Sequence, residues 1–370
     1  MKYTILALVA ILALNSAYGA LTHKSYNQQY GSFLYGKEAL TGEKAFHMYI
    51  DFLETYKGVS GNEVLNHMDK FFTFKSNLNE IVEHNISPYR TFDKGVSQFT
   101  DMTGDEFMDY FNLKVNAEQK CSATASKPKV YNDDIPSSFD WRDEKKVTPV
   151  KNQASCGSCW TFSTVGAMES HFLIHTDKTF ANFSEQQLVD CAGAYDCHGC
   201  AGGLPSYAFN YIRDNGMTTE SQYDYHAVDQ DCTYTKSMEA VITSGPFNIT
   251  ARDEVQMKEA LYKEGPISCS FQVASDFRDY STGTYTSTIC KNGEMDINHA
   301  VLCVGYGNDD VSGLDFWAVK NSWGASWGND GYFQIERGVN MCGIGVCNSY
   351  PENVAPVTKF SIEGYLKQTI

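Results

Sequence analysis

The hydrophobic periodicity of the sequence changes once along the chain, and this change constrains the fold more than any other feature. Apolar residues from Trp160 to Ile174 predict one long amphipathic helix, and Ser184 with Gln187 predicts a capping box that opens a helix at 185–191. From Val241 onward, short β-prone runs follow at 267–273, 300–306, 316–320 and 332–335. A helical half followed by a β-rich half predicts an α+β fold of two subdomains with a cleft between them.

A separate helical region precedes these two halves. Apolar residues recur there at helical spacing in two stretches, the first with Phe46, Tyr49, Ile50 and Leu53 and the second with Leu65, Met68, Phe72, Ile81 and Val82. Between Lys114 and Asp134 this periodicity stops and polar residues dominate, which is typical of an exposed, cleavable connector. We therefore expect a domain boundary there.

The first residues predict export. Met1-Lys2, an apolar run from Ile5 to Leu14 and the small residues before Ala20 match a secretory signal cleaved after Gly19. The apolar run is too short for a membrane span, which takes roughly 20 residues, and no later stretch is apolar enough. We expect a soluble protein of the secretory pathway, located in a lysosome or vacuole or outside the cell.

Composition narrows the classes of partner. Twelve cysteines in an exported chain favour disulfides, and Cys197-x-x-Cys200 lacks the second pair that a zinc site needs, so we expect no metal and no cofactor. The formal charge of −16 disfavours nucleic acid and anionic membranes as partners. Asn182-Phe-Ser and Asn248-Ile-Thr are acceptors for N-glycosylation.

Four polar side chains in the second part of the chain predict a catalytic set. Cys159 directly precedes the long predicted helix, whose dipole favours a thiolate over a thiol. His299 is the candidate base, and Asn321 can fix its tautomer, with Trp323 excluding water from that hydrogen bond. Gln153 can donate its amide N–H to an oxyanion, together with the backbone N–H of Cys159. Each residue alone also fits a structural role, but the set predicts a cysteine nucleophile with a histidine base.

The segment Cys156-Gly-Ser-Cys159-Trp160, followed by His299 and by Asn321-Ser-Trp-Gly324, resembles the papain-like cysteine peptidases. The resemblance implies a papain-like fold, with a helical left half, a β-rich right half and the active-site cleft between them. It implies a monomer that hydrolyses peptides or proteins and is inhibited by cystatin-type proteins. It also implies three disulfides, Cys156–Cys200, Cys191–Cys232 and Cys290–Cys342. Cys269 and Cys303 lie in apolar strand runs, and we expect both to be free buried thiols.

The N-terminal helical region resembles the inhibitory propeptide of the same family. One motif matches at Phe74, Asn77, Ile81 and Asn85, while Asn66 and Lys70 replace the usual Glu and Arg. A second motif matches at Gly95, Ser97, Phe99 and Asp101, with serine in the usual asparagine position. The chain's own propeptide is therefore expected to act as its inhibitor.

The run Glu118–Thr124 resembles the mini-chain of the cathepsin H-like branch of the family, a propeptide remnant that stays disulfide-bonded to the enzyme. This resemblance pairs Cys121 with Cys347. A terminal carboxylate on Thr124 and a substrate α-ammonium are both charged between roughly pH 4 and 7, so the remnant would select free amino termini. The resemblance also lines the substrate site with Gly202, Gly203, Leu204, Pro205, Ser270, Ile297, Ala300 and Trp323.

These inferences divide the chain into five parts. They are a signal peptide at 1–19, an inhibitory propeptide at 20–116, a mini-chain at 117–124, an excised linker at 125–134 and a peptidase domain at 135–370 with an extension from about 352. The expected activity is that of an aminopeptidase. A cathepsin L-like endopeptidase without a retained mini-chain is the alternative, and a catalytically silent binding or storage homologue is a third possibility that the intact catalytic set disfavours.

Overall fold

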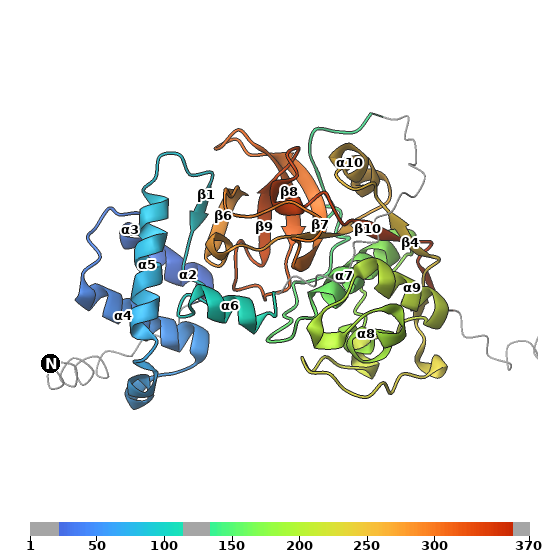
Figure 1. Ribbon diagram of the computed structural model, residues 1–370, viewed down its shortest axis with the longest axis horizontal. Helices are drawn as coiled ribbons and strands as arrows, with labels where there is room; N and C mark the ends of the chain where they lie inside the picture. The colour runs from blue at the N-terminus through green and yellow to red at the C-terminus, as the bar shows by residue number, and fades with distance from the viewer. Residues whose placement is uncertain (1–21, 114–133, 358–370) are drawn as a thin grey trace, which may run out of the picture.

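The computed structural model describes residues 22–113 and 134–357. The predicted signal peptide, the predicted mini-chain with Cys121 and Thr124, and the end of the tail lie outside the described residues. Figure 1 shows the N-terminal helices on one side, the sheet in the centre and the remaining helices on the other side.

The N-terminal region is mainly helical, as the sequence predicts. Threonine side chains cap three of its helices, because Thr22, Thr41 and Thr103 each accept a hydrogen bond from a backbone N–H of the first turn. Helix α4 continues into a π-helical turn at Leu53–Lys57, and a 3₁₀ segment covers Gly61–His67. The α-helices and strand are α2 (His23–Gln29), α3 (Gly31–Leu34), α4 (Gly42–Phe52), α5 (Phe71–Asn85), β1 (Phe92–Lys94) and α6 (Gly104–Tyr110).

The second apolar stretch of this region does not form one helical stripe. Helix α5 starts only at Phe71, and its buried face runs through Phe74, Leu78 and Ile81. Phe72 is 75% exposed because it lies on the opposite face of α5, and Leu65 lies in the 3₁₀ segment with 39% exposure. Helical spacing of apolar residues in this stretch therefore does not by itself place a side chain in the core.

The helical half of the second part is built around α7 (Cys159–His175). The sequence predicted an amphipathic helix, but α7 is buried on nearly all sides from Trp160 to Leu173, because the sheet packs on it as well as the neighbouring helices. Figure 1 shows α8 and α9 beside it. The other elements are α8 (Glu185–Cys191), α9 (Pro205–Asn215) and 3₁₀ turns at Ala192–Tyr195, Gly199–Ala201, Glu220–Gln222 and Lys236–Met238.

Helix α8 begins where the sequence predicts, but only half of the expected capping box forms. The Ser184 hydroxyl accepts a hydrogen bond from the backbone N–H of Gln187 at 3.0 Å. The Gln187 side chain does not bond back to Ser184. Instead, its amide donates to the Gly216 carbonyl and accepts from the Thr218 backbone N–H. The buried Gln187 side chain therefore fixes the segment at Gly216 and Thr218 and does not cap its own helix.

The β-rich half is a mixed sheet with strand order β1-β6-β9-β8-β7-β5-β10-β4, in which β2 also pairs with β7. The β6–β9 pair is parallel and the others are antiparallel. The four predicted strands are present as β5, β7, β8 and β9, whereas α10 (Glu254–Lys263) is a helix that the sequence analysis did not predict. The bounds are β2 (Phe139–Asp140), β3 (Val241–Ile242), β4 (Gly245–Asn248), β5 (Ile267–Phe271), β6 (Tyr280–Tyr285), β7 (His299–Asn308), β8 (Asp315–Lys320), β9 (Tyr332–Glu336), β10 (Ser349–Glu352) and β11 (Ala355–Pro356), with 3₁₀ turns at Ser275–Phe277 and Met341–Gly343.

The N-terminal region is docked on the β-rich half. Strand β1 pairs antiparallel with β6, with Phe92 opposite Gly283. Three aromatic side chains around α6, Phe99, Phe107 and Phe111, are buried in the same hydrophobic cluster as the sheet. Helices α2 to α5 have a separate hydrophobic core of their own. The region therefore combines an independent core with an aromatic contact surface.

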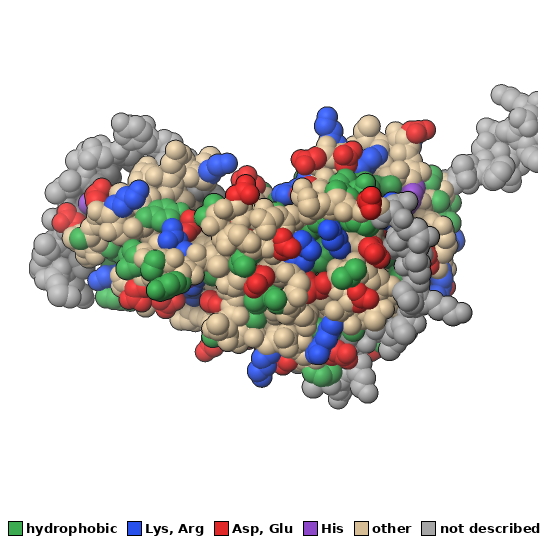
Figure 2. Space-filling model, turned by 90° about the horizontal axis from the view of Figure 1, so that it is seen from above, with side chains coloured by type: hydrophobic (Ala, Val, Ile, Leu, Met, Phe, Trp, Pro, Cys, Tyr) green, Lys and Arg blue, Asp and Glu red, His purple; other side chains and the backbone are tan. Residues whose placement is uncertain are grey.

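Both cysteines lie among the described residues in three disulfides, Cys156–Cys200, Cys191–Cys232 and Cys290–Cys342, and these are the three pairs that the resemblance implies for them. Cys269 and Cys303 are free and buried on adjacent strands, as expected, and Cys197 is also free and buried. Acidic and basic side chains are interspersed on the face in Figure 2, so the excess of acidic residues is not gathered into one patch there.

Candidate active site

Two structural elements bring the predicted nucleophile and base together. Cys159 is the first residue of α7, and His299 is the first residue of β7. The backbone N–H of Ala300, next to His299, donates to the Cys159 sulfur at 3.5 Å. The site therefore lies where the N-terminus of the central helix meets the start of a central strand.

The imidazole of His299 is oriented by its neighbours. Its Nε2 lies 2.8 Å from Oδ1 of Asn321, the residue directly after β8. The Trp323 ring is fully buried and stacks on the imidazole at 4.9 Å between centroids. Nδ1 is buried without a hydrogen-bond partner among the described residues. Because Asn321 engages Nε2, Nδ1 is the nitrogen left for exchange of a proton with Cys159.

Desolvation disfavours the charged form of each member of this pair, although the Cys159 side chain is only partly buried. It raises the pKa of the Cys159 thiol to about 11, although backbone hydrogen bonds, that from Ala300 first, oppose the rise. Burial also lowers the pKa of His299 to about 4, with the hydrogen bond to Asn321 opposing it. The sequence analysis expects the helix N-terminus to favour a thiolate, and desolvation in this form of the protein acts against that effect.

Gln153 lies beside the nucleophile and is fully buried. Its Nε2 donates to the carbonyl of Cys156 at 2.9 Å, and its Oε1 accepts from the Ser322 hydroxyl at 2.6 Å. The second bond fixes the orientation of the amide, so that the N–H₂ group points toward the loop that precedes Cys159. Sequence reasoning missed Ser322, although its position directly after Asn321 was a usable signal.

A cleft pocket of about 70 Å³ lies next to Cys159. Six of the predicted substrate-site residues line it, together with Cys159 and His299: Gly202, Gly203, Leu204, Ser270, Ile297 and Ala300. Pro205 and Trp323 do not line this pocket. Pro205 is buried as the first residue of α9, and Trp323 stacks on His299, so their contact with substrate stays a prediction. Glu294, Met295 and Asn298 also line the pocket, and sequence reasoning missed them.

The N-terminal region covers this cleft. Phe111 and Asn112 are part of the pocket lining. The Phe111 ring stacks on Trp323 at 4.7 Å, and Nδ2 of Asn112 donates to the carbonyl of Cys200 at 3.1 Å. The chain before Lys114 therefore occupies space that a substrate would need.

Polar contacts hold the same region in place. Gln98 donates to the Trp323 carbonyl at 2.8 Å, and Thr100 donates to Asp279 at 2.8 Å. Within the region, Asp101 forms an ion pair with Lys57 at 3.0 Å. Lys70, which replaces the usual arginine, forms an ion pair with Glu106, and this hydrogen bond lowers the pKa of Glu106.

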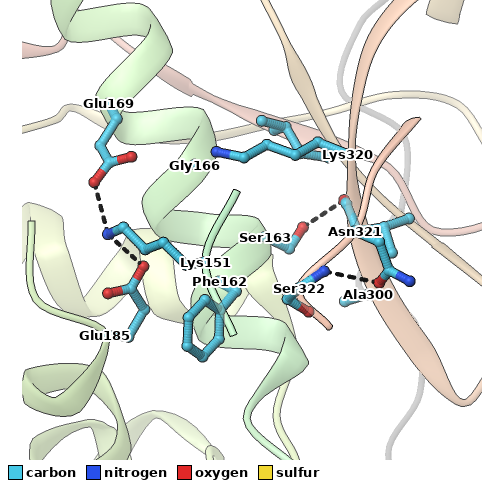
Figure 3. A pocket seen from close by; sticks show the side chains of 12 residues that line it. Lys151, Phe162, Ser163, Gly166, Glu169, Glu185, Ala300, Lys320, Asn321 and Ser322 are labelled. Carbon is cyan, nitrogen blue, oxygen red and sulfur yellow. Dashed lines mark hydrogen bonds and ion pairs between the residues drawn. The ribbon is translucent and has the colours of Figure 1, made fainter. Parts of the chain in front are cut away.

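A cluster of charged side chains, most of them buried, lines a second pocket together with Asn321 and Ser322 (Figure 3). Lys151 bridges Glu169 at 2.9 Å and Glu185 at 2.8 Å. Lys320, directly before Asn321, donates to the Thr148 hydroxyl at 3.1 Å, and that hydroxyl donates to Glu169. Burial raises the pKa of Glu185 to about 7 and lowers that of Lys320 to about 8. This cluster joins the helical half to the strand that carries Asn321.

The remaining predicted sites are not part of the pocket lining. Asn182 is partly buried beside an isolated β-bridge of Phe183 with Thr219, and Asn248 ends strand β4. Cys347 is disulfide-bonded. Within residues 22–113 and 134–357, no group of three or more His, Cys, Asp or Glu side chains could hold a metal ion. In the same ranges, no helix is long and apolar enough to cross a bilayer.

Comparison with known proteins shows which protein family the chain resembles. Residues 135–352 match the papain family cysteine proteases, and residues 51–107 match the cathepsin propeptide inhibitor domain. The chain is 46% identical over 308 residues to pro-cathepsin H of Bos taurus, covering 83% of this chain and 89% of that protein. It is 46% identical over 284 residues to the thiol protease aleurain of Arabidopsis thaliana, covering 76% and 77%. Among solved structures, digestive procathepsin L 3 of Tenebrio molitor larval midgut matches with a TM-score of 0.74 and 33% identity, over 83% of this chain and 99% of that one.

Proposed function

The chain belongs to the papain family of cysteine proteases and carries a cathepsin propeptide inhibitor domain, and from this premise we propose that Cys159 is its nucleophile and His299 its general base. One observation carries the proposal. The contact between the Cys159 sulfur and the N–H of Ala300 sets the start of α7 against the strand that presents His299, while Asn321 holds the imidazole.

The proposed reaction uses these side chains in two steps. Cys159 gives its proton to Nδ1 of His299, and the thiolate attacks the scissile carbonyl carbon to form a C–S bond. The N–H groups of Gln153 and Cys159 donate to the oxyanion, and His299 returns the proton to the amine as the C–N bond breaks. Water then attacks the thioester carbonyl and gives a proton to His299; the C–S bond breaks, the carboxylic acid is released, and His299 returns the proton to the Cys159 thiolate. Asn321 keeps the imidazole in the required tautomer throughout.

The precursor is held inactive in two ways in this proposal. Phe111 and Asn112 block the cleft, and desolvation disfavours the charged forms of Cys159 and His299. Removal of the propeptide admits water and substrate, which lowers the thiol pKa and raises that of the imidazole. Acid should assist the release. A carboxyl with a depressed pKa such as Glu106 stabilises the folded propeptide above its ordinary pKa, and that stabilisation is lost as the pH falls through the depressed value.

We propose further that the matured enzyme acts mainly as an aminopeptidase with a retained mini-chain. The support comes from Cys347, which is disulfide-bonded. Each of the other described cysteines either belongs to one of the three named disulfides or is a free thiol. The proposal gives Cys347 the partner Cys121, which tethers residues 117–124 near the cleft. The terminal carboxylate of Thr124 then binds the substrate α-ammonium, and the remnant blocks longer chains. An endopeptidase without this remnant is the second candidate, favoured by the structural likeness to a procathepsin L.

The test compares two substrate classes in the matured wild-type enzyme and in Cys347→Ser. A carboxylate–ammonium contact contributes about 1–3 kcal/mol, so its loss should reduce turnover of unblocked aminoacyl amides by roughly ten- to a hundredfold. Cleavage of N-acylated peptides should improve at the same time, because the tethered segment no longer blocks the cleft. Cys121→Ser is the matched variant and should give the same two changes. Intact masses before and after reduction should show a remnant of residues 117–124 in wild type only, and a wild type that prefers N-acylated substrates would favour the endopeptidase.

The cellular setting completes the proposal. The signal peptide at 1–19 and N-glycans on Asn182 and Asn248 would send the chain through the secretory pathway to a lysosome, a vacuole or the exterior. There it would act as a monomer on peptides and proteins, with its own propeptide and cystatin-type proteins as inhibitors. The boundaries proposed for the matured enzyme are residues 117–124 and 135–370, with the linker 125–134 removed.

A further inference from the structure

The pocket beside Cys159 carries one carboxylate. Among the described residues that line it, Glu294 is the only aspartate or glutamate, and none is a lysine or an arginine. Leu204, Met295 and Ile297 supply apolar wall around it. A substrate side chain that enters this pocket therefore meets apolar surface and a single negative charge.

The loop that presents Glu294 is fixed. The Cys290–Cys342 disulfide anchors the start of the loop. A turn closes across Gly293 and Asp296, in which the backbone N–H of Asp296 donates to the Gly293 carbonyl at 3.0 Å. The Asp296 carboxylate in turn accepts from the Gly293 N–H at 3.1 Å. Glu294 lies inside this turn, so its backbone position at the mouth of the cleft is defined before any substrate binds.

The other charges of the loop neutralise one another. Lys291 lies 3.9 Å from Asp296 and forms an ion pair with it. Glu294 is exposed, and no hydrogen bond or ion pair joins its carboxylate to another of the described residues. Its charge therefore remains available to a ligand in the pocket.

We propose that Glu294 is a specificity-determining residue that binds a cationic side chain of the substrate, so that the enzyme prefers lysine or arginine in this pocket. The proposal rests on the peptidase function proposed above. A long aliphatic stem fits against Leu204 and Ile297, while the ammonium or guanidinium group at its end reaches the carboxylate. In the precursor, Phe111 and Asn112 share this pocket, so the preference belongs to the matured enzyme.

The test compares arginine with citrulline, its uncharged isostere, in fluorogenic amides. Arginine or citrulline occupies either the first or the second position before the scissile bond, and each substrate is made with a free and with an acylated N-terminus. In wild type, kcat/KM for arginine should exceed that for citrulline by about two- to fivefold at one of the two positions, the range expected for an exposed ionic contact. Glu294→Gln should bring this ratio close to one, and Glu294→Lys should invert it. Added salt should lower the ratio in wild type and leave it unchanged in Glu294→Gln.

Glu144→Gln is the matched control, because Glu144 is also exposed but is not part of the pocket lining, and it should keep the wild-type ratio. An equal arginine preference in wild type and Glu294→Gln would overturn the proposal. So would an effect of Glu294→Gln on free-amino substrates alone, since the carboxylate would then bind the α-ammonium instead. If wild type hydrolyses none of the substrates, the proposed peptidase site itself fails, and the specificity proposal fails with it.

Discussion

Replacing Lys151 with methionine tests the charge cluster that lines the second pocket most directly. The ammonium group bridges two carboxylates at 2.9 and 2.8 Å, and these carboxylates, on Glu169 and Glu185, are 0% and 2% exposed (Figure 3). Breaking a buried ion pair by removing one partner costs about 3–5 kcal/mol, because the other charge is left without compensation. The Lys151 side chain is itself 25% exposed, so we expect a loss near the lower end, about 3 kcal/mol at pH 7.

The loss should depend on pH in a defined direction. Burial raises the pKa of Glu185, so the folded state binds more protons than the unfolded state, and this group contributes less stability as the pH rises from its ordinary pKa toward about 7. Lys151 opposes that shift, and its removal raises the pKa further. The variant should therefore lose most stability near neutral pH and less at pH 5, where protonation removes the uncompensated charge.

Guanidinium unfolding of the precursor, with Cys159→Ala in the background to prevent self-processing, measures the free energy of unfolding at both pH values. Lys178→Met is the control, because Lys178 is exposed and forms no described ion pair. Adding Glu185→Gln to Lys151→Met should recover part of the loss, since it removes one of the two unpaired charges. A loss equal to that of the control at pH 7, or a loss that increases toward pH 5, would refute the reasoning.

The remaining predictions concern catalysis and inhibition. Cys159→Ser should abolish peptidase activity with the fold retained, and activity above a trace level would show that the nucleophile is elsewhere. His299→Ala should reduce kcat as severely, whereas Asn321→Ala should reduce it less, because the amide orients the base and transfers no proton; equal small losses in both would contradict the assigned roles. Phe111→Ala in the isolated propeptide should raise its inhibition constant for the matured enzyme by roughly a hundredfold, because a ring stacked on Trp323 with 1% exposure contributes about 3 kcal/mol. Phe72→Ala, which removes a ring that is 75% exposed, should leave that constant nearly unchanged.

Local sequence signals were sufficient where neighbouring residues decide the structure. Helices α7 and α8 and strands β5, β7, β8 and β9 lie where periodicity and capping residues predicted them. The same signals failed for Phe72, because an apolar residue on a helix does not reveal which face will be covered. They also failed for the Gln187 side chain, because its better partners at Gly216 and Thr218 are distant in sequence.

The sequence by itself determined the chemistry of this protein. The residue types and order of Gln153, Cys159, His299 and Asn321 identify the reaction class, since few other arrangements use a cysteine, a histidine and two amides in this way. Only the tertiary structure decided how strongly the surroundings of Cys159 and His299 oppose the charged forms of these two residues. Phe111 and Asn112 line the pocket around Cys159 and His299, and desolvation there opposes the thiolate that the helix N-terminus favours and the imidazolium that Asn321 favours. Desolvation depends on which distant segments cover a group, and no local pattern in the sequence encodes that cover.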